Sequence, residues 1–308
     1  MLQRPFLTPV VIAFWCVTTG WLTVAKILPA WQPGTPPGQQ ARYATGSRLL
    51  PVAWTVTCDD QPLGWALTRL TRTDRSGVIV DSHLHLERVP WEELLPGLAT
   101  LLMRRLTDQR DTRFDARGRM AIDEQGTLNS FSSVVNLPGA DQPVVLTGLV
   151  DEGTVMMHVA AGDLRYDFKR HLPTDMMLGD EFSPHATLPG LAEGRRWTVP
   201  TYNPLRAGRA PLEILHAEVG PEGFVYWEDR LVPAHVVVYR DDPSTTCEPR
   251  CRLWVDRSGR VLRQETKLLG ARLAFVRRSD DEAARMAETE DGSAPPAATL
   301  PTGETTTP

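Results

Sequence analysis

The sequence predicts a mainly β fold with a minor helical part: one strongly curved antiparallel sheet or half-barrel, covered by one or two helices and preceded by a transmembrane helix. Three observations lead to this fold class. The run Leu7–Ala25 is apolar and uncharged. From Pro51 onward, short segments with alternating apolar and polar residues recur at intervals of about ten residues, as in large antiparallel sheets. Two segments, Trp91–Leu106 and Asp175–Gly190, interrupt this alternation.

The apolar run near the N-terminus has the length of a membrane-spanning helix. Its 19 residues would form a helix about 29 Å long, close to the hydrocarbon thickness of a bilayer. Arg4 and Lys26 bracket the run, and flanking cations are typical of an anchor. The alternative is a cleaved signal peptide, for which Thr23-Val24-Ala25 is the best cleavage motif. We therefore expect a single-pass protein of the bacterial cytoplasmic membrane with the bulk of the chain extracytoplasmic (periplasmic).

Composition divides the chain into four parts. These are a membrane anchor or uncleaved signal (1–28), a Pro/Gly-rich linker (29–48), a β-rich extracytoplasmic domain (49–278) and a disordered acidic tail rich in Thr and Pro (279–308). The tail holds seven carboxylates and one arginine, a net charge of −6, so the rest of the chain is left with about +1 of the total of −5. The domain itself is close to neutral, which argues against nucleic acid as a partner. The tail has too little apolar bulk to offset its ordering entropy.

Within the domain, the alternation predicts a meander of strands. The clearest strand is Val78–Arg88, whose apolar positions alternate with charged residues and histidines. Turn-like sequences such as Asp256-Arg257-Ser258-Gly259 separate neighbouring strands. The other expected strands are Val52–Val56, Leu63–Arg72, Asp111–Ala116, Thr127–Asn136, Pro143–Val150, Thr154–Ala160, Asp163–His171, Leu212–Val219, Phe224–Glu228, Ala234–Arg240, Arg252–Asp256, Val261–Lys267 and Ala271–Arg277.

The two interrupting segments are predicted to be helical. Trp91–Leu106 places its leucines on one helical face, and Pro96-Gly97 should kink that helix. Asp175–Gly190 is rich in Met, Pro and Gly and is expected to form a short helix followed by a loop. Both segments are candidates to cover one face of the curved sheet. They would either line an apolar cavity or fill a dry core.

Several short strings in the domain resemble a known class of domain. They are Trp54-Thr55-Val56, Leu63-Gly64-Trp65-Ala66, Leu253-Trp254-Val255-Asp256 and Gly259-Arg260-Val261-Leu262-Arg263-Gln264-Glu265. Together with the histidine-rich strand and the kinked helix, they resemble the β-rich extracytoplasmic domains that precede transglutaminase-like modules in bacteria. More distantly, the layout is similar to LolA-like lipoprotein-carrier folds, which implies an apolar cavity between sheet and helices. The transglutaminase-like catalytic module is not found here, so the resemblance does not imply that activity.

The sharpest candidate for chemistry is His83 with His85. Residues two apart on a strand share a face, so both imidazoles project together with Asp81 and Glu87. This arrangement could begin a metal site if a third ligand came from elsewhere. The same pattern also fits a solvated strand face.

Two further pairs of residues are singled out. Cys247 and Cys251 flank a short loop and are expected to form a disulfide in an oxidising compartment, with two free thiols as the alternative and a metal site as a remote one. Trp197 and Tyr202 lie in an extended, proline-bounded segment. They would form a rim for a ligand or partner, unless Trp197 is simply a core residue.

The sequence favours a non-enzymatic function. It contains no G-x-S-x-G motif and no glycine-rich phosphate loop, so no catalytic residues and no cofactor are assigned. The leading hypothesis is a membrane-anchored scaffold or interaction domain of the cell envelope. The alternative is a carrier or binder of a lipid or other apolar ligand, and the third is a metal-dependent enzyme using His83 and His85. The expected partners are the membrane, through residues 7–25, and an envelope protein or a lipid.

Overall fold

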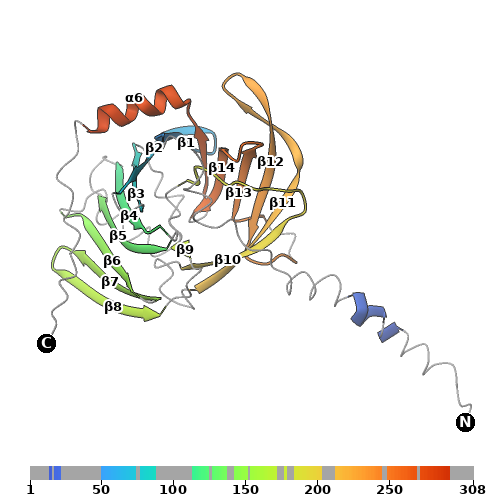
Figure 1. The fold of residues 1–308 in the computed structure, drawn as a ribbon, viewed down its shortest axis with the longest axis horizontal. Coiled ribbons are helices and arrows are strands. Elements are labelled where there is room, and N and C mark those ends of the chain that lie inside the picture. Colours follow the sequence, from blue (N-terminus) through green and yellow to red (C-terminus); the bar gives the residue numbers. More distant parts are fainter. Residues whose placement is uncertain are drawn as a thin grey trace, which may run out of the picture.

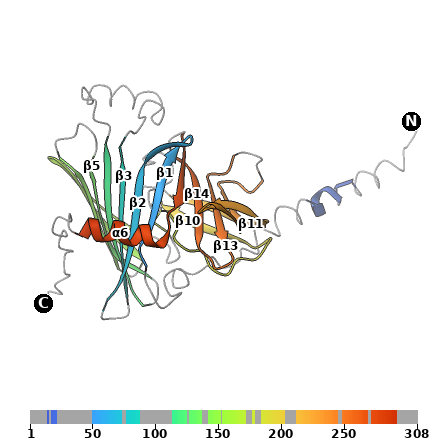
Figure 2. The same ribbon diagram turned by 90° about the horizontal axis from the view of Figure 1, so that it is seen from above.

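The computed structural model describes the β-rich domain and a helix that follows it. The described residues are 14–15, 17–21, 50–73, 77–87, 113–124, 127–136, 142–151, 153–171, 177–178, 184–202, 212–244, 248–268 and 271–291. The predicted helix Trp91–Leu106 lies outside them. They form one large sheet that curls on itself, with the helix α6 (Asp280–Asp291) on its outer side (Figures 1 and 2).

The sheet is a meander that grows in both directions from its middle. Its order is β8-β7-β6-β5-β4-β3-β2-β1-β15-β14-β13-β12-β11-β10-β9, so the first and last strands pair and the sheet does not close. Its strands pair antiparallel, apart from the two-residue β9, which runs parallel to β10. The strands are β1 (Val52–Cys58), β2 (Gln61–Arg72), β3 (Val78–Leu86), β4 (Phe114–Ile122), β5 (Leu128–Asn136), β6 (Val144–Asp151), β7 (Thr154–Ala161), β8 (Leu164–His171), β9 (Met177–Leu178), β10 (Arg196–Tyr202), β11 (Leu212–Trp227), β12 (Arg230–Arg240), β13 (Cys251–Asp256), β14 (Val261–Leu268) and β15 (Ala271–Arg277).

The prediction of a mainly β, strongly curved antiparallel sheet is confirmed, and most expected strands are present. β10 and β9 were not expected as strands. β11 is a single long strand where two were predicted, because the register shift between Val219 and Glu222 absorbs the Gly-Pro break without ending the pairing. The prediction of a short helix within Asp175–Gly190 is wrong at Met177–Leu178, which pair with β10.

The inner face of the sheet carries the main core. Side chains alternate along each strand, and the inward set includes Trp54, Val56, Leu84, Trp197 and Phe275 in one cluster. Leu188, from the irregular segment before β10, is fully buried in the same cluster. The main core therefore lies beneath β1–β4 and β10–β15. We call the strands β5–β8 the wing.

The helix α6 corrects the expectation that the chain is disordered from Ser279 onward. Ser279 accepts a hydrogen bond from the backbone N–H of Glu282, as an N-cap does. Asp280, Asp281 and Glu282 occupy the first turn, where carboxylates favour the helix dipole. Ala283 packs with Ala53 and Leu67 on the outer face of β1 and β2. The few apolar side chains of this helix are buried against the sheet, and their burial stabilises the helix. The overall composition of the tail does not indicate this.

The N-terminal run remains a prediction. Within it, Phe14–Trp15 and Val17–Trp21 are described and are helical. No helix among the described residues is long and apolar enough to cross a membrane. The expected transmembrane helix at Leu7–Ala25 is therefore not confirmed, and the linker 29–48 lies outside the described residues.

Candidate functional site

The two histidines of β3 meet a carboxylate of the neighbouring strand on the outer face. In the β3–β4 register, His85 stands opposite Asp115 and His83 opposite Arg117. Nε2 of His83 lies 2.7 Å from Oδ2 of Asp115, and Nδ1 of His85 lies 3.2 Å from the same oxygen. Asp115 is thus the third group that the sequence pattern required but could not locate. We call His83, His85, Asp115 and Glu290 the histidine–carboxylate cluster.

The fourth member of this cluster comes from α6. Oε2 of Glu290 lies 2.9 Å from Nδ1 of His83, so that imidazole is held by a carboxylate at each ring nitrogen. Arg117 lies beside both acids, with Nε 3.5 Å from Oδ1 of Asp115 and Nη2 4.0 Å from Oε2 of Glu290. This guanidinium offsets part of the negative charge of the two carboxylates.

The cluster is only partly open to solvent, and its rings are packed. The side chain of His83 is 10% exposed, against 27% for His85. The Trp65 indole stands edge-on to His83 with centroids 4.7 Å apart and stacks on His85 at 5.5 Å. These ring contacts restrict the orientation of both imidazoles.

Asp115 is a member of the cluster whose pKa is lowered by its surroundings. Partial burial would raise the pKa of its carboxyl, but the opposing effects are larger. The hydrogen bond and charge of His83, the hydrogen bond of His85 and the charge of Arg117 together hold the pKa of Asp115 below its usual range. The carboxyl is therefore ionised at neutral pH and can accept two N–H groups or bind a cation.

The other predicted members of the site lie apart from the cluster. Asp81 shares the outer face but pairs with Arg119, whose Nε is 2.6 Å from Oδ1 of Asp81. Glu87 follows the end of β3, and its backbone N–H bonds to the carbonyl of Leu63. Sequence spacing placed Asp81 on the correct face but could not show that Arg119, which lies opposite it on β4, is its partner.

The inner face of the wing is a second feature of interest. It is mostly apolar, although Ser133 and Arg170 also occupy positions on it. Toward the edge strand β8 the apolar side chains are no longer fully covered: Leu164 is 76% exposed and Tyr166 67%. Cross-strand neighbours on the same face are partly exposed, and they are Val135, Val144, Leu146, Val159 and Phe168. Nearer the other end of these strands, Phe131, Val155 and Met157 form a small buried cluster.

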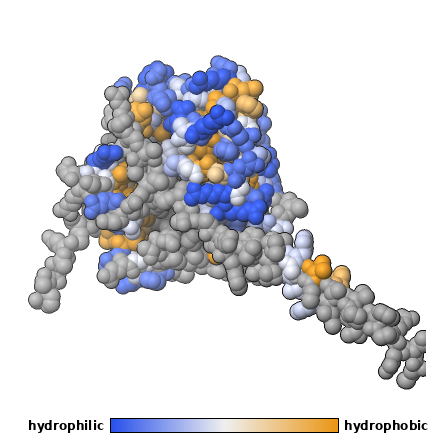
Figure 3. Space-filling view, turned by 45° about the vertical axis from the view of Figure 1, so that its right-hand side comes forward, coloured by the Kyte–Doolittle hydropathy of each residue, from blue (hydrophilic) through white to orange (hydrophobic). Residues whose placement is uncertain are grey.

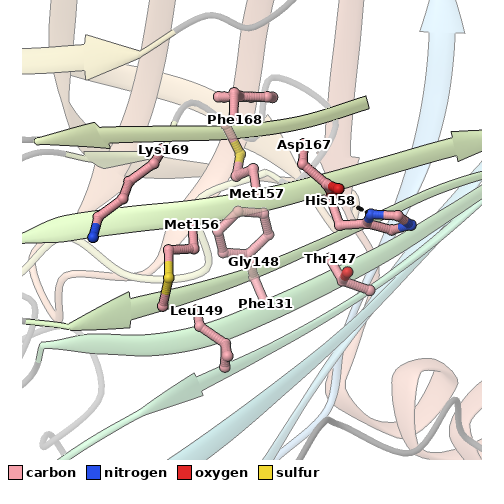
Figure 4. A pocket seen from close by; sticks show the side chains of 10 residues that line it. All are labelled: Phe131, Thr147, Gly148, Leu149, Met156, Met157, His158, Asp167, Phe168 and Lys169. Atoms are coloured by element: carbon pink, nitrogen blue, oxygen red, sulfur yellow. Dashed lines mark hydrogen bonds and ion pairs between the residues drawn. The ribbon is translucent and has the colours of Figure 1, made fainter. Parts of the chain in front are cut away.

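A shallow pocket of about 450 Å³ crosses the same strands (Figure 4). Two cross-strand rows on the outer face flank it, Thr147–His158–Asp167 and Leu149–Met156–Lys169. Between them runs the row Phe131–Gly148–Met157–Phe168, whose side chains belong to the inner face. The dashed line in Figure 4 marks the pair between His158 and Asp167, an outer-face histidine–carboxylate pair outside the cluster described above.

A third feature is the hairpin of β11 and β12. One of its faces, with Val225 and Trp227, packs against Leu262. The opposite face exposes Phe224 (70%), Tyr226 (65%) and Leu231 (67%). Figure 3 shows that the described surface in that view is mostly hydrophilic, with apolar groups in scattered patches. The hairpin therefore carries, in addition to the exposed end of the wing, a second group of exposed large apolar residues.

The structure decides between the two interpretations of Trp197. The side chain is 1% exposed and belongs to the main core, where its ring meets Tyr239 edge-on. The proposed rim is thus wrong for Trp197, because alternation in β10 turns its indole toward the inner face. Tyr202 ends β10 opposite Leu212, and its side chain lies outside the described part.

The predicted disulfide is not tested. Cys251 begins β13 and is partly buried, whereas Cys247 lies outside the described residues. The pairing between the two therefore stays a prediction.

Comparisons with known proteins leave the family of this chain open. No family model matches the sequence, and no curated protein matches it. A β-barrel-like protein of the domain of unknown function DUF1849 from Brucella abortus has a similar solved structure, with 11% identity, a TM-score of 0.43 and coverage of 76% of this chain and 98% of that one. A DUF1089 family protein from Pseudomonas aeruginosa has 15% identity, a TM-score of 0.32 and coverage of 64% and 87%. Neither the transglutaminase-linked nor the LolA-like resemblance is confirmed.

Proposed function

We propose that this protein is a non-enzymatic binding protein of the cell envelope that holds a chain-like apolar ligand, such as a lipid acyl chain, on the inner face of the wing. One observation carries the proposal: apolar side chains of that face remain partly or strongly exposed, ending in Leu164 and Tyr166. Exposing such a face to water is unfavourable by about 25 cal/mol for each Å² of apolar area. A ligand that covers it would recover that free energy.

The shape of the face suits an extended ligand. Neighbouring strands lie about 4.8 Å apart, so cross-strand neighbours such as Leu146, Val159 and Tyr166 form a continuous apolar row. In the adjacent cross-strand row, Phe168 is partly exposed and can adjust to a flexible chain, because aromatic rings tolerate varied contacts. The face offers apolar cover rather than chemistry, which fits a carrier or storage role.

The predicted anchor supports the same proposal. If the run Leu7–Ala25 tethers the protein to the membrane, the domain remains within reach of membrane lipids. A tether also raises the local concentration of such ligands around the wing. The location at the cytoplasmic membrane, with the domain on the extracytoplasmic side, is part of this proposal.

Lipid extraction and mass spectrometry on the full chain purified from a membrane-containing host test the proposal. We expect an apolar molecule to co-purify with the wild type and to be lost in Tyr166→Glu, which puts a charge on the inner face. The matched control is Met156→Glu, which alters the outer face of the adjacent strand at a side chain that is 43% exposed. A wild type that carries no such molecule and does not bind a fluorescent fatty acid would refute the proposal.

The exposed hairpin face favours a second candidate function, an interaction domain. Phe224, Tyr226 and Leu231 could dock on an apolar patch of an envelope protein, because aromatic side chains dominate such contacts. A photo-crosslinking residue placed at Tyr226 should give one discrete adduct in cells, which Leu231→Glu abolishes. The same residue placed at Arg257, which is exposed but ion-paired with Glu222, should give none. Equal crosslinking at both positions would argue against this function.

A further inference from the structure

We propose that His83, His85 and Asp115 form a binding site for a divalent transition-metal ion of the Zn²⁺ type on the outer face of the sheet, beneath the C-terminal end of α6. This site is independent of the ligand-binding wing. The three residues come from two adjacent strands, each offers one ligand atom, and these atoms all lie within 4.8 Å of one another.

The distances between the ligand atoms are close to those of a metal site. Zn²⁺ binds imidazole nitrogen at about 2.0–2.1 Å and carboxylate oxygen at about 2.0–2.2 Å. Tetrahedral ligand atoms are then separated by about 3.4 Å. Here Oδ2 of Asp115 lies 2.7 Å from Nε2 of His83 and 3.2 Å from Nδ1 of His85. Small ring rotations would therefore admit an ion between the three groups.

The residues around the three ligands resemble those that orient the ligands in known kinds of metal site. A ligating histidine usually donates its other ring N–H to a carboxylate, which fixes the tautomer. Glu290 occupies that position at Nδ1 of His83; in the tautomer with the proton on Nδ1, the lone pair of Nε2 would face Asp115 and be available to an ion. Trp65 holds both rings, and Arg117 offsets part of the carboxylate charge. His83, His85 and Asp115 would be the ligands, and Glu290 would be a positioning residue.

The donor set narrows the class of ion. Two imidazole nitrogens and one carboxylate oxygen suit Zn²⁺, Co²⁺, Ni²⁺ and Fe²⁺, whereas Mg²⁺ and Ca²⁺ prefer oxygen ligands only. Three protein ligands leave a further coordination position for water or another group. The inference is one of metal binding and assigns no reaction to the ion.

The competing explanation is a metal-free hydrogen-bonded network. A neutral imidazole has one donor and one acceptor nitrogen, whereas two ionised carboxylates only accept. The observed contacts of His83 could then be those of an imidazolium between Asp115 and Glu290. The two explanations differ in whether the folded protein takes up an ion, which can be measured directly.

The test is equilibrium dialysis of the full chain, carrying no histidine tag, against Zn²⁺ at neutral pH, followed by elemental analysis. We expect one tightly bound ion per chain and loss of that ion in His85→Gln and in Asp115→Asn. Glu290→Gln should weaken affinity by about 10- to 100-fold, as loss of such a positioning carboxylate does. The matched control is His158→Gln, because His158 pairs with Asp167 on the same outer face but belongs to no group of three ligands among the described residues.

The proposal fails if the wild type takes up no more Zn²⁺ than His85→Gln does, or if His158→Gln loses the ion equally. Circular dichroism melts of each variant show whether loss of metal reflects unfolding. If the cluster variants do not fold, the absorption spectrum of the wild type with Co²⁺ decides. Bands of tetrahedral or five-coordinate Co²⁺ would support the site, and the spectrum of hydrated Co²⁺ would overturn it.

Discussion

The Nδ1 atom of His83 on β3 lies 2.9 Å from Oε2 of Glu290 on α6, although 207 positions separate the two residues in the chain. This contact is at the end of α6 opposite to Ser279. Ala283 and Ala287 of the helix are buried on Ala53 and Leu67, so the polar contact and the apolar contact hold α6 along its length. The helix is thereby an integral part of the domain and contributes Glu290 to the histidine–carboxylate cluster.

Enlarging the buried alanine of α6 should loosen this helix. Ala283 is 1% exposed and packs against the sheet, so Ala283→Leu should lower the free energy of unfolding by about 1–3 kcal/mol through overpacking. Arg285→Leu, on the exposed side of the same helix, should change it by less than about 0.5 kcal/mol. Urea unfolding measures both values. Amide hydrogen exchange at 280–291 should speed up in the first variant, and unchanged exchange would contradict the packing described.

A glycine in the wing makes room for an aromatic ring. A Cβ at Gly148 would lie 2.2 Å from Cζ of Phe131, and that ring is buried. We expect Gly148→Ala to destabilise the protein by about 1–3 kcal/mol. Phe131→Leu introduced into Gly148→Ala should restore part of the loss, which a double-mutant cycle of thermal unfolding measures. Strict additivity of the two changes would show that the ring and the glycine do not interact.

Asp256 should make stability depend on pH in the acid range. Burial would raise the pKa of this carboxyl, but hydrogen bonds from Ser258, from the backbone and side chain of Arg260, and the charge of Arg260 lower it overall. A folded-state pKa below the unfolded value stabilises the protein above about pH 4, and this contribution is lost as the pH falls through the folded-state pKa.

The matching variant is Asp256→Asn at the β13–β14 turn. At pH 7 it should cost about 1–3 kcal/mol, since a buried hydrogen-bonded network loses its charge. The difference between wild type and variant should shrink as the pH falls below about 4. Urea unfolding at a series of pH values measures it. A difference that stays constant across the acid range would assign the cost to packing instead.

A substitution at Trp197 tests whether its side chain belongs to the core or lines a rim for a ligand. The indole is fully buried, so Trp197→Ala should cost about 3–5 kcal/mol of stability. Phe224→Ala, at a side chain 70% exposed, should change stability by less than about 0.5 kcal/mol. Thermal or urea unfolding compares the two. A small effect at Trp197 would restore the interpretation that it lines a rim.

Local alternation was sufficient to predict most of the sheet. Strands such as β3 have a period of two that depends on neighbouring residues alone, and the turn at Asp256–Gly259 follows from its own residues, with Gly259 at φ 85°. Strand β10 is not predicted by alternation because Arg196 and Pro200 within it, with Arg195 and Pro204 beside it, suggest exposure. Its place in the sheet comes from pairing with β11 and from the burial of Trp197 and Val199.

The sequence by itself determined that His83 and His85 share one face of a strand, since alternation is a local property. Only the tertiary structure decided what they face: Asp115 through the β3–β4 register and Glu290 through the docking of α6. The same holds for α6, whose composition is that of an acidic tail and whose order comes from burial of Ala283 and Ala287 on β1 and β2. Contacts between residues far apart in the chain depend on strand register and packing, which no local pattern encodes.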